Sequence, residues 1–72
     1  MSEFKVKLKE VREGSLVTQE ELSQRSGVGK ASISRIESGR HVPRFSTIRK
    51  LAAALGVDPQ ALIERNEIGA GS

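Results

Sequence analysis

Apolar side chains recur along the chain at the three- to four-residue spacing that is typical of amphipathic helices. The clearest repeat comprises Ile48, Leu51, Ala52 and Leu55. It predicts a helix that opens at Phe45 or Ser46 and stops at Gly56, which breaks the pattern. Pro43 biases the residue before it away from helical angles, so residues 40–44 are predicted to form a loop.

A capping box marks the start of an earlier helix. The Thr18 hydroxyl can accept the amide proton of Glu21, and the Glu21 carboxylate can reach back to the Thr18 amide. The helix is therefore predicted to begin at Gln19. It should end at Gly27, because glycine readily takes the left-handed conformation that follows a helix.

A third helix is predicted directly after it. Gly29 is an acceptable N-cap, and Gly39 is placed to end the helix. Between them, Ile33 and Ile36 lie about one turn apart and so share one face.

The connection between these two helices is very short, because only Gly27 and Val28 separate them. Such a turn forces a steep crossing angle, which requires small or apolar residues around it. The residues that meet this requirement are Leu22, Ser23, Val28, Ile33 and Ile36. The stretch 19–40 is therefore predicted to be a helix-turn-helix.

The two ends of the chain carry looser patterns. Residues 5–13 place Val6, Leu8 and Val11 among charged residues, which predicts a helix with one apolar side. Residues 5–9 also alternate as a strand would, but no hairpin turn or second alternating run is present to pair with them. Asp58 and Pro59 are a typical N-cap and first helical residue, and they predict a short helix through residue 63.

Together these patterns predict an all-α fold, a compact bundle of five short helices. At 72 residues and 36% apolar content, the chain can build one small core, so residues 1–66 are expected to form a single domain. The tail 67–72 has nothing to anchor it and is expected to be disordered. The chain has no cysteine, which excludes disulfides and thiolate metal sites and suits a reducing cytoplasm. No apolar stretch is long enough for a membrane span or a signal peptide.

Charge is concentrated in the middle of the chain. Residues 1–24 carry four basic and five acidic side chains (−1), residues 25–50 carry seven and one (+6), and residues 51–72 carry one and three (−2). A basic block of this kind attracts a polyanion such as a phosphate backbone. A solvated surface would account for the charge equally well.

The outward side of the third helix makes nucleic acid the better interpretation. With Ile33 and Ile36 turned inward, its outer positions are Lys30, Ala31, Ser34 and Arg35, with Ser32 at the margin. These side chains are small or basic, and none is acidic. Small residues permit close approach to a groove, and Lys or Arg can donate to guanine O6 and N7. An ordinary solvated helix face would mix Glu with Lys.

Signs of catalysis are missing from the sequence. His41 is the only histidine and falls in a predicted loop without a nearby acidic partner. Glu20 and Glu21 are adjacent, so they point in different directions on a helix and cannot work as a pair. We find no nucleophile with a base and no metal-binding cluster. We therefore expect neither enzymatic activity nor a metal, cofactor or small-molecule ligand.

The sequence resembles the helix-turn-helix domains of the phage repressor and Cro superfamily, also called the XRE family, from about Val6 to Ile63. The residues that carry the resemblance are Thr18-Gln19-Glu20-Glu21-Leu22, Gly27-Val28, Ile33-Ser34-Arg35-Ile36-Glu37-Ser38-Gly39-Arg40, Pro43 and Leu51-Ala52-Ala53-Ala54-Leu55-Gly56-Val57. The resemblance implies the lambda-repressor-like fold and binding to double-stranded DNA.

The resemblance also implies roles for individual residues. Positions that meet base edges correspond to Lys30, Ala31 and Arg35, and we expect Ser34 on the same outer side to join them. Positions that grip phosphates correspond to Gln19, Arg40, Arg44 and the backbone amide of Phe45, and we expect Thr18 and Ser32 to contact phosphate as well. Gln19 would also buttress the recognition helix. Arg12 and Glu37 match a buried salt bridge between the first and third helices, which would be structural.

The sequence departs from the family pattern at two positions. The glycine expected about two residues before the capping box is replaced by Leu16, and Gly14 comes early, so a different turn is expected there. At Gly29 the family more often has Ser or Thr, whose side chain can both cap the helix and contact phosphate. Glycine keeps the geometry but loses that contact.

These observations predict a small transcriptional regulator, most simply a repressor, that binds a palindromic operator as a homodimer. The candidates for the dimer interface are Val57, Leu62 and Ile63, which could equally belong to the core. The alternative is an antitoxin or another protein-interaction module that uses the helix-turn-helix as a scaffold.

Overall fold

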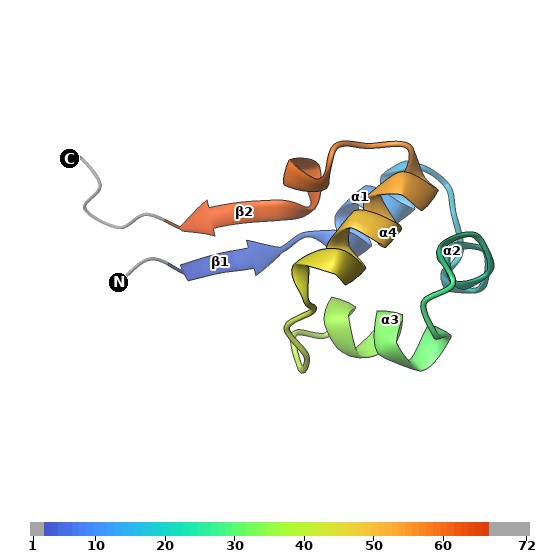
Figure 1. Ribbon diagram of the computed structural model, residues 1–72, viewed down its shortest axis with the longest axis horizontal. Coiled ribbons are helices and arrows are strands. Elements are labelled where there is room, and N and C mark those ends of the chain that lie inside the picture. Colours follow the sequence, from blue (N-terminus) through green and yellow to red (C-terminus); the bar gives the residue numbers. More distant parts are fainter. Residues whose placement is uncertain (1–2, 67–72) are drawn as a thin grey trace.

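Helix α4 lies at the centre of a small helical bundle (Figure 1). The computed structural model describes residues 3–66. Its elements are the strand β1 (Glu3–Val6), the helices α1 (Leu8–Gly14), α2 (Gln19–Ser26), α3 (Lys30–Glu37) and α4 (Phe45–Leu55), the 3-10 helix η1 (Pro59–Leu62) and the strand β2 (Ile63–Asn66). Helix α4 packs against α2 and η1, and α2 packs against α3. Figure 1 shows α3 along the lower side of the bundle, with the two strands projecting from one end.

The core forms where the predicted apolar faces meet. Its buried residues are Leu8, Val17, Leu22, Ile33, Ile36, Ile48, Leu51, Ala52 and Leu62. Ile33 is fully buried and Ile36 is 3% exposed, which confirms the inward side assigned to the third helix. Burying a side chain of this size stabilises the fold by about 1.5–3 kcal/mol.

The helix-turn-helix has the predicted boundaries. The capping box is present, because the Thr18 amide donates to Glu21 Oε1 at 2.9 Å and the Glu21 amide donates to Thr18 Oγ1 at 3.0 Å. Helix α2 ends at Gly27, whose φ of 78° lies in the left-handed region. Helix α3 follows after Gly29, and α4 begins at Phe45 as expected.

The fold is mostly helical, as predicted, but it is not all-α, because segments near the two ends of the chain form an antiparallel two-stranded sheet. In its register Val6 pairs with Ile63 and Glu3 pairs with Asn66. The Lys7 amide continues the ladder by donating to the Leu62 carbonyl at 2.7 Å. The first two residues of the alternating run at 5–9, Lys5 and Val6, therefore do belong to a strand. Its partner lies at the opposite end of the chain, where no local pattern could reveal it.

The five-helix bundle is also wrong, since the described residues contain four α-helices. Asp58 does cap the expected helix, with its Oδ1 accepting from the Gln60 amide at 3.1 Å. The helix is nevertheless a single 3-10 turn, because Ile63 takes extended angles (φ −122°, ψ 131°) and enters β2. Helix α1 starts at Leu8 rather than at residue 5, because the chain up to Val6 belongs to β1. The tail expected to be disordered, residues 67–72, lies outside the described residues.

The turn between α1 and α2 contains a leucine in the left-handed conformation that glycine usually takes. Leu16 has a φ of 60°. It is the only non-glycine residue of the described chain in the left-handed region. Its side chain is 90% exposed and so gains little from packing. A left-handed conformation costs a residue with a Cβ about 1–2 kcal/mol. Leu16 therefore carries backbone strain that a glycine at this position would not.

Candidate nucleic-acid interface

The outer side of α3 is a continuous exposed surface. Lys30, Ala31, Ser34 and Arg35 are all exposed, and Ser32 is half-buried at the margin. Within residues 3–66, no hydrogen bond or ion pair engages the side chains of Lys30, Ser34 or Arg35. These donors are therefore free to bind an external partner.

The start of α3 is uncapped by any side chain. Gly29 takes the extended N-cap conformation (φ −60°, ψ 144°) without a side-chain hydrogen bond to the helix. The first amides of a helix have no partner within it, and they carry partial positive charge. The loss of a capping hydroxyl thus leaves backbone donors at the end of α3 that also bears Lys30.

Three polar side chains lock the other end of α3 to α1 and α2. Arg12 Nε donates to Glu37 Oε2 at 2.6 Å, and Arg12 Nη2 donates to Glu37 Oε1 at 3.2 Å. Gln19 Nε2 donates to the same Oε1 at 2.9 Å. Arg12 Nη1 also donates to the Val17 carbonyl at 2.8 Å, so the buried guanidinium is well satisfied. The hydrogen bonds to Glu37 raise the pKa of Arg12, which stays charged at every physiological pH.

The carboxylate of Glu37 is correspondingly enclosed, with a side chain only 5% exposed. The salt bridge implied by the family resemblance is therefore present, and it joins α1 to α3. Gln19, the first residue of α2, is tied to the same carboxylate. This places the proposed phosphate ligand beside the recognition helix.

Thr18 has a divided role at the start of α2. Its hydroxyl oxygen accepts the Glu21 amide, so only the hydroxyl proton remains for a phosphate oxygen. The Thr18 amide donates to Glu21 Oε1 at 2.9 Å, and hydrogen bonding from the backbone and side chain of Thr18 to this carboxylate lowers the pKa of Glu21 from its usual range.

A second group of phosphate candidates lies beyond α3. Arg40, Arg44 and Phe45 are exposed, and Arg44, the N-cap of α4, makes no side-chain capping bond. The Phe45 amide is thus one of the unpaired donors at a helix start. The sequence analysis missed the contact of Arg49, whose guanidinium carbon lies 5.2 Å from the Phe45 ring centroid. A cation and an aromatic ring at i and i+4 on a helix could have revealed it.

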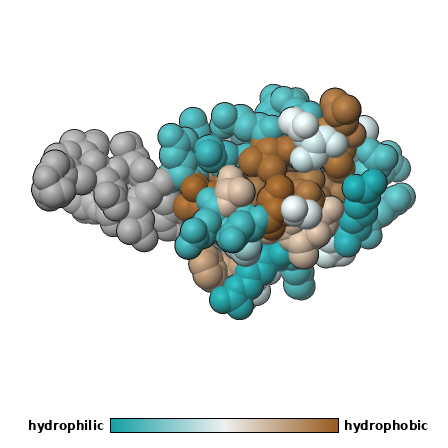
Figure 2. All heavy atoms as spheres, turned by 90° about the horizontal axis from the view of Figure 1, so that it is seen from above, coloured by the Kyte–Doolittle hydropathy of each residue, from teal (hydrophilic) through white to brown (hydrophobic). Residues whose placement is uncertain are grey.

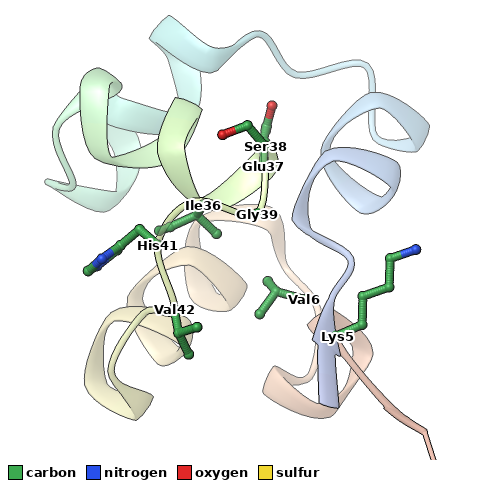
Figure 3. Close-up of a pocket in the computed structure, with 8 residues that line it drawn as sticks. All are labelled: Lys5, Val6, Ile36, Glu37, Ser38, Gly39, His41 and Val42. Atoms are coloured by element: carbon green, nitrogen blue, oxygen red, sulfur yellow. The ribbon is translucent and has the colours of Figure 1, made fainter. Parts of the chain in front are cut away.

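A groove of about 330 Å³ with both polar and apolar lining lies between the loop at residues 38–44 and β1. Figure 3 shows Val6, Ile36 and Val42 around it, while His41 points away from the groove. Val42 is 69% exposed.

A smaller polar notch lies between the first three helices. It has a volume of about 180 Å³ and is lined by Lys9, Gln19, Ser34, Glu37 and Ser38. Gln19 and Ser34 were candidate DNA contacts, but Lys9 was not. Counting charges along the sequence could not have singled out Lys9, because the segment that contains it, residues 1–24, has a net charge of −1.

Residues 3–66 contain no group of three His, Cys, Asp or Glu side chains that could hold a metal ion. Among these residues there is also no helix with the length and apolarity needed to cross a bilayer.

Comparison with known proteins identifies the family. A family model described as Helix-turn-helix matches residues 8–62, so the chain belongs to the helix-turn-helix family. Within it, the chain is of the phage repressor and Cro type, the XRE family, as its motifs predicted.

Several transcriptional regulators are similar in sequence. The HTH-type transcriptional repressor RghR of Bacillus subtilis is 44% identical over 64 residues, which span 88% of this chain and 47% of RghR. RghRB of the same organism, an HTH-type transcriptional regulator that is itself uncharacterised, is 42% identical over 88% of this chain and 46% of its own length. The HTH-type transcriptional activator BcrR of Enterococcus faecalis is 30% identical over 92% of this chain and 32% of BcrR. The chain thus spans less than half the length of these relatives.

Two solved structures share the fold. The restriction-modification controller protein C.AhdI of Aeromonas hydrophila superposes with a TM-score of 0.74 at 32% identity, over 78% of this chain and 85% of C.AhdI. A protein of Bacteroides fragilis superposes with a TM-score of 0.79 at 29% identity, over 86% of this chain and all of that protein.

Proposed function

We propose that this chain is a sequence-specific DNA-binding module that regulates transcription and inserts α3 into the major groove. The observation that carries the proposal is the exposed, acid-free outer side of α3, whose donors have no partners within residues 3–66. Lys30 and Arg35 can donate to guanine O6 and N7, while Ala31 and Ser34 allow close approach. A helix of this size fits the major groove, which is about 12 Å wide.

Phosphate contacts on both sides of α3 would fix its orientation. Gln19 and Thr18 lie at the start of α2, and Arg40, Arg44 and the Phe45 amide follow α3. Contacts of this kind position a protein on the duplex without reading its sequence. Ser32, which is half-buried, would contribute the least of the proposed ligands.

Repression is the direction that we propose. RghR, the relative named above with the highest identity, is a repressor, whereas the activator BcrR is less similar. A repressor needs only to occupy DNA. The proposed activity requires no catalysis and no cofactor, and it belongs in the compartment that holds the DNA, the cytoplasm of a bacterial cell.

We further propose that the chain binds a palindromic operator as a homodimer. Figure 2 shows the face away from α3, where apolar residues gather between polar ones. Of the candidate contacts, Leu62 is fully buried in its own core, so a partner could reach only Val57 and Ile63, which are half-buried. A two-fold axis at this contact would repeat α3 in the second copy, and a palindromic operator would then need half-sites about 34 Å apart.

Selection of bound sequences from a random duplex library tests the proposal. We expect one enriched motif with inverted half-sites. The logarithm of the binding constant for the enriched duplex should fall steeply with the logarithm of the salt concentration. No enrichment and a salt slope near zero would contradict DNA binding. Such a result, together with a stoichiometric protein partner in co-purification, would favour the interaction module instead. An enriched motif without inverted symmetry would contradict only the dimer.

A further inference from the structure

The notch between α1, α2 and α3 adds a residue from outside the helix-turn-helix to the candidate interface. Lys9, on the first turn of α1, lines it together with Gln19 and Ser34. The notch volume of about 180 Å³ exceeds the roughly 30 Å³ that one water occupies in the liquid. A group of several atoms can therefore enter.

The hydrogen-bonding groups of the notch are mainly unused donors. Lys9 is exposed and has no hydrogen bond or ion pair within residues 3–66, so its ammonium offers three donors. Gln19 gives one amide proton of Nε2 to Glu37 and keeps the other. The Ser34 hydroxyl also lacks a partner in the described chain. Ser38 Oγ is already committed, since it donates to the Arg35 carbonyl at 3.1 Å.

The acidic residue of the notch does not oppose an anion. Both oxygens of Glu37 accept from Arg12, and Oε1 also accepts from Gln19. Its charge is offset by the buried guanidinium, which leaves Lys9 as the uncompensated charge among the lining side chains. A positively charged recess rich in free donors is suited to an oxygen anion.

We propose that this notch seats one phosphodiester group of the DNA backbone, with Lys9 as its charged ligand and Gln19 as a neutral donor. The inference rests on the proposed function, because the notch adjoins the outer side of α3 through Ser34. A lysine binds phosphate as a point charge without reading bases. Lys9 therefore contributes affinity and salt dependence, and base preference is left to α3.

The test compares Lys9→Ala with wild type on the enriched duplex, by fluorescence anisotropy between 50 and 200 mM salt. Loss of one phosphate contact should make the log-log salt slope shallower by about 0.9. The affinity ratio of wild type to variant should then be about 3.5-fold larger at 50 mM than at 200 mM. The selected motif should stay the same.

Two further variants serve as controls. Lys9→Arg keeps the charge and should keep the wild-type slope. Lys50→Ala removes an equal charge from an exposed position on α4 that does not line the notch, and its slope should also match wild type. Because neither lysine has a partner inside the described chain, thermal unfolding should be unaltered in all three.

The outcomes separate this inference from the function on which it rests. A steep wild-type slope that Lys9→Ala leaves unchanged overturns the Lys9 site alone, as does an equal loss of slope in Lys50→Ala. A wild type without salt-dependent DNA binding overturns the proposed function and the site with it.

Discussion

The two sides of α3 differ in how their polar and apolar groups are engaged. On the inner side, Ile33 and Ile36 are buried in the core and Glu37 is held by Arg12 and Gln19. On the outer side, Lys30 and Arg35 are exposed and have no partner within residues 3–66.

The inner side of this eight-residue helix therefore serves stability, and its outer side is left for the proposed contact with DNA. Inner substitutions should weaken folding, because they leave cavities or unpaired buried charge. Outer substitutions should weaken DNA binding and leave folding intact, because no described residue depends on those side chains for a hydrogen bond or an ion pair.

The largest expected effect comes from the inner side, through Arg12→Met. Methionine keeps an apolar stem but leaves the Glu37 carboxylate, 5% exposed, without its cation. Stranding a buried charge costs about 3–5 kcal/mol, and we expect a loss of this size in the free energy of unfolding by urea denaturation. Arg25→Met, at an exposed position on α2, should change it by less than about 0.5 kcal/mol. If both variants lose equally little, the ion pair does not hold α3 in place.

The next effect comes from the outer side, where two arginines should lose different things. Arg35→Ala should remove about 1–3 kcal/mol of discrimination at one base pair of each half-site. Arg44→Ala should instead weaken all sequences alike and make the salt slope shallower by about 1. Both variants should unfold like wild type. Binding selection with each variant checks this, and identical losses would contradict the division into base and phosphate contacts.

A smaller effect tests whether stability can change without touching recognition. Leu16→Gly should relieve strain of about 1–2 kcal/mol and cost about 0.5–1 kcal/mol in chain entropy. The expected net gain in unfolding free energy is therefore about 1 kcal/mol, with unchanged DNA affinity. Leu16→Ala retains the left-handed strain and should show no comparable gain in the same denaturation experiment. A gain of equal size in both would mean that strain is not the cause.

The smallest effect concerns the capping box of α2. The pKa of Glu21 is lower in the folded chain than in the unfolded chain, because Thr18 hydrogen-bonds to the carboxylate. Its contribution is therefore complete above the unfolded value near 4.5 and is lost as the pH falls through the lower folded value. Glu21→Gln keeps the cap without a titrating group, so its stability should fall less steeply with acid. If the unfolding free energies of the two proteins fall in parallel as the pH is lowered, this prediction is contradicted.

The sequence predicted those parts of the fold that local signals specify. The capping box at Thr18, the glycine at 27 and the inward pair Ile33 and Ile36 all act within a few residues, and each was found as expected. The pairing of Val6 with Ile63 joins opposite ends of the chain. Such a contact has no local signature, so the sheet and the shortened last helix were missed.

The candidate site divides in the same way. Helical spacing alone separated the outer residues of α3 from the core. Lys9 lies at the site only because α1 packs against α3. The charge count along the sequence could not reveal this position, because residues 1–24 sum to a negative charge. Leu16 is the converse case, since the family pattern singled out its position from the sequence, and the structure shows there the left-handed backbone that glycine favours.

We propose above that the outer side of α3 is the surface that meets DNA. Isotope-labelled protein can be titrated with the enriched duplex, and the change in each backbone amide chemical shift then reports which residues lie at the DNA. We predict the largest shifts at residues 30–35, with further shifts at Gln19 and residues 40–45. Shifts confined to the face around Val57, with α3 unaffected, would contradict the claim.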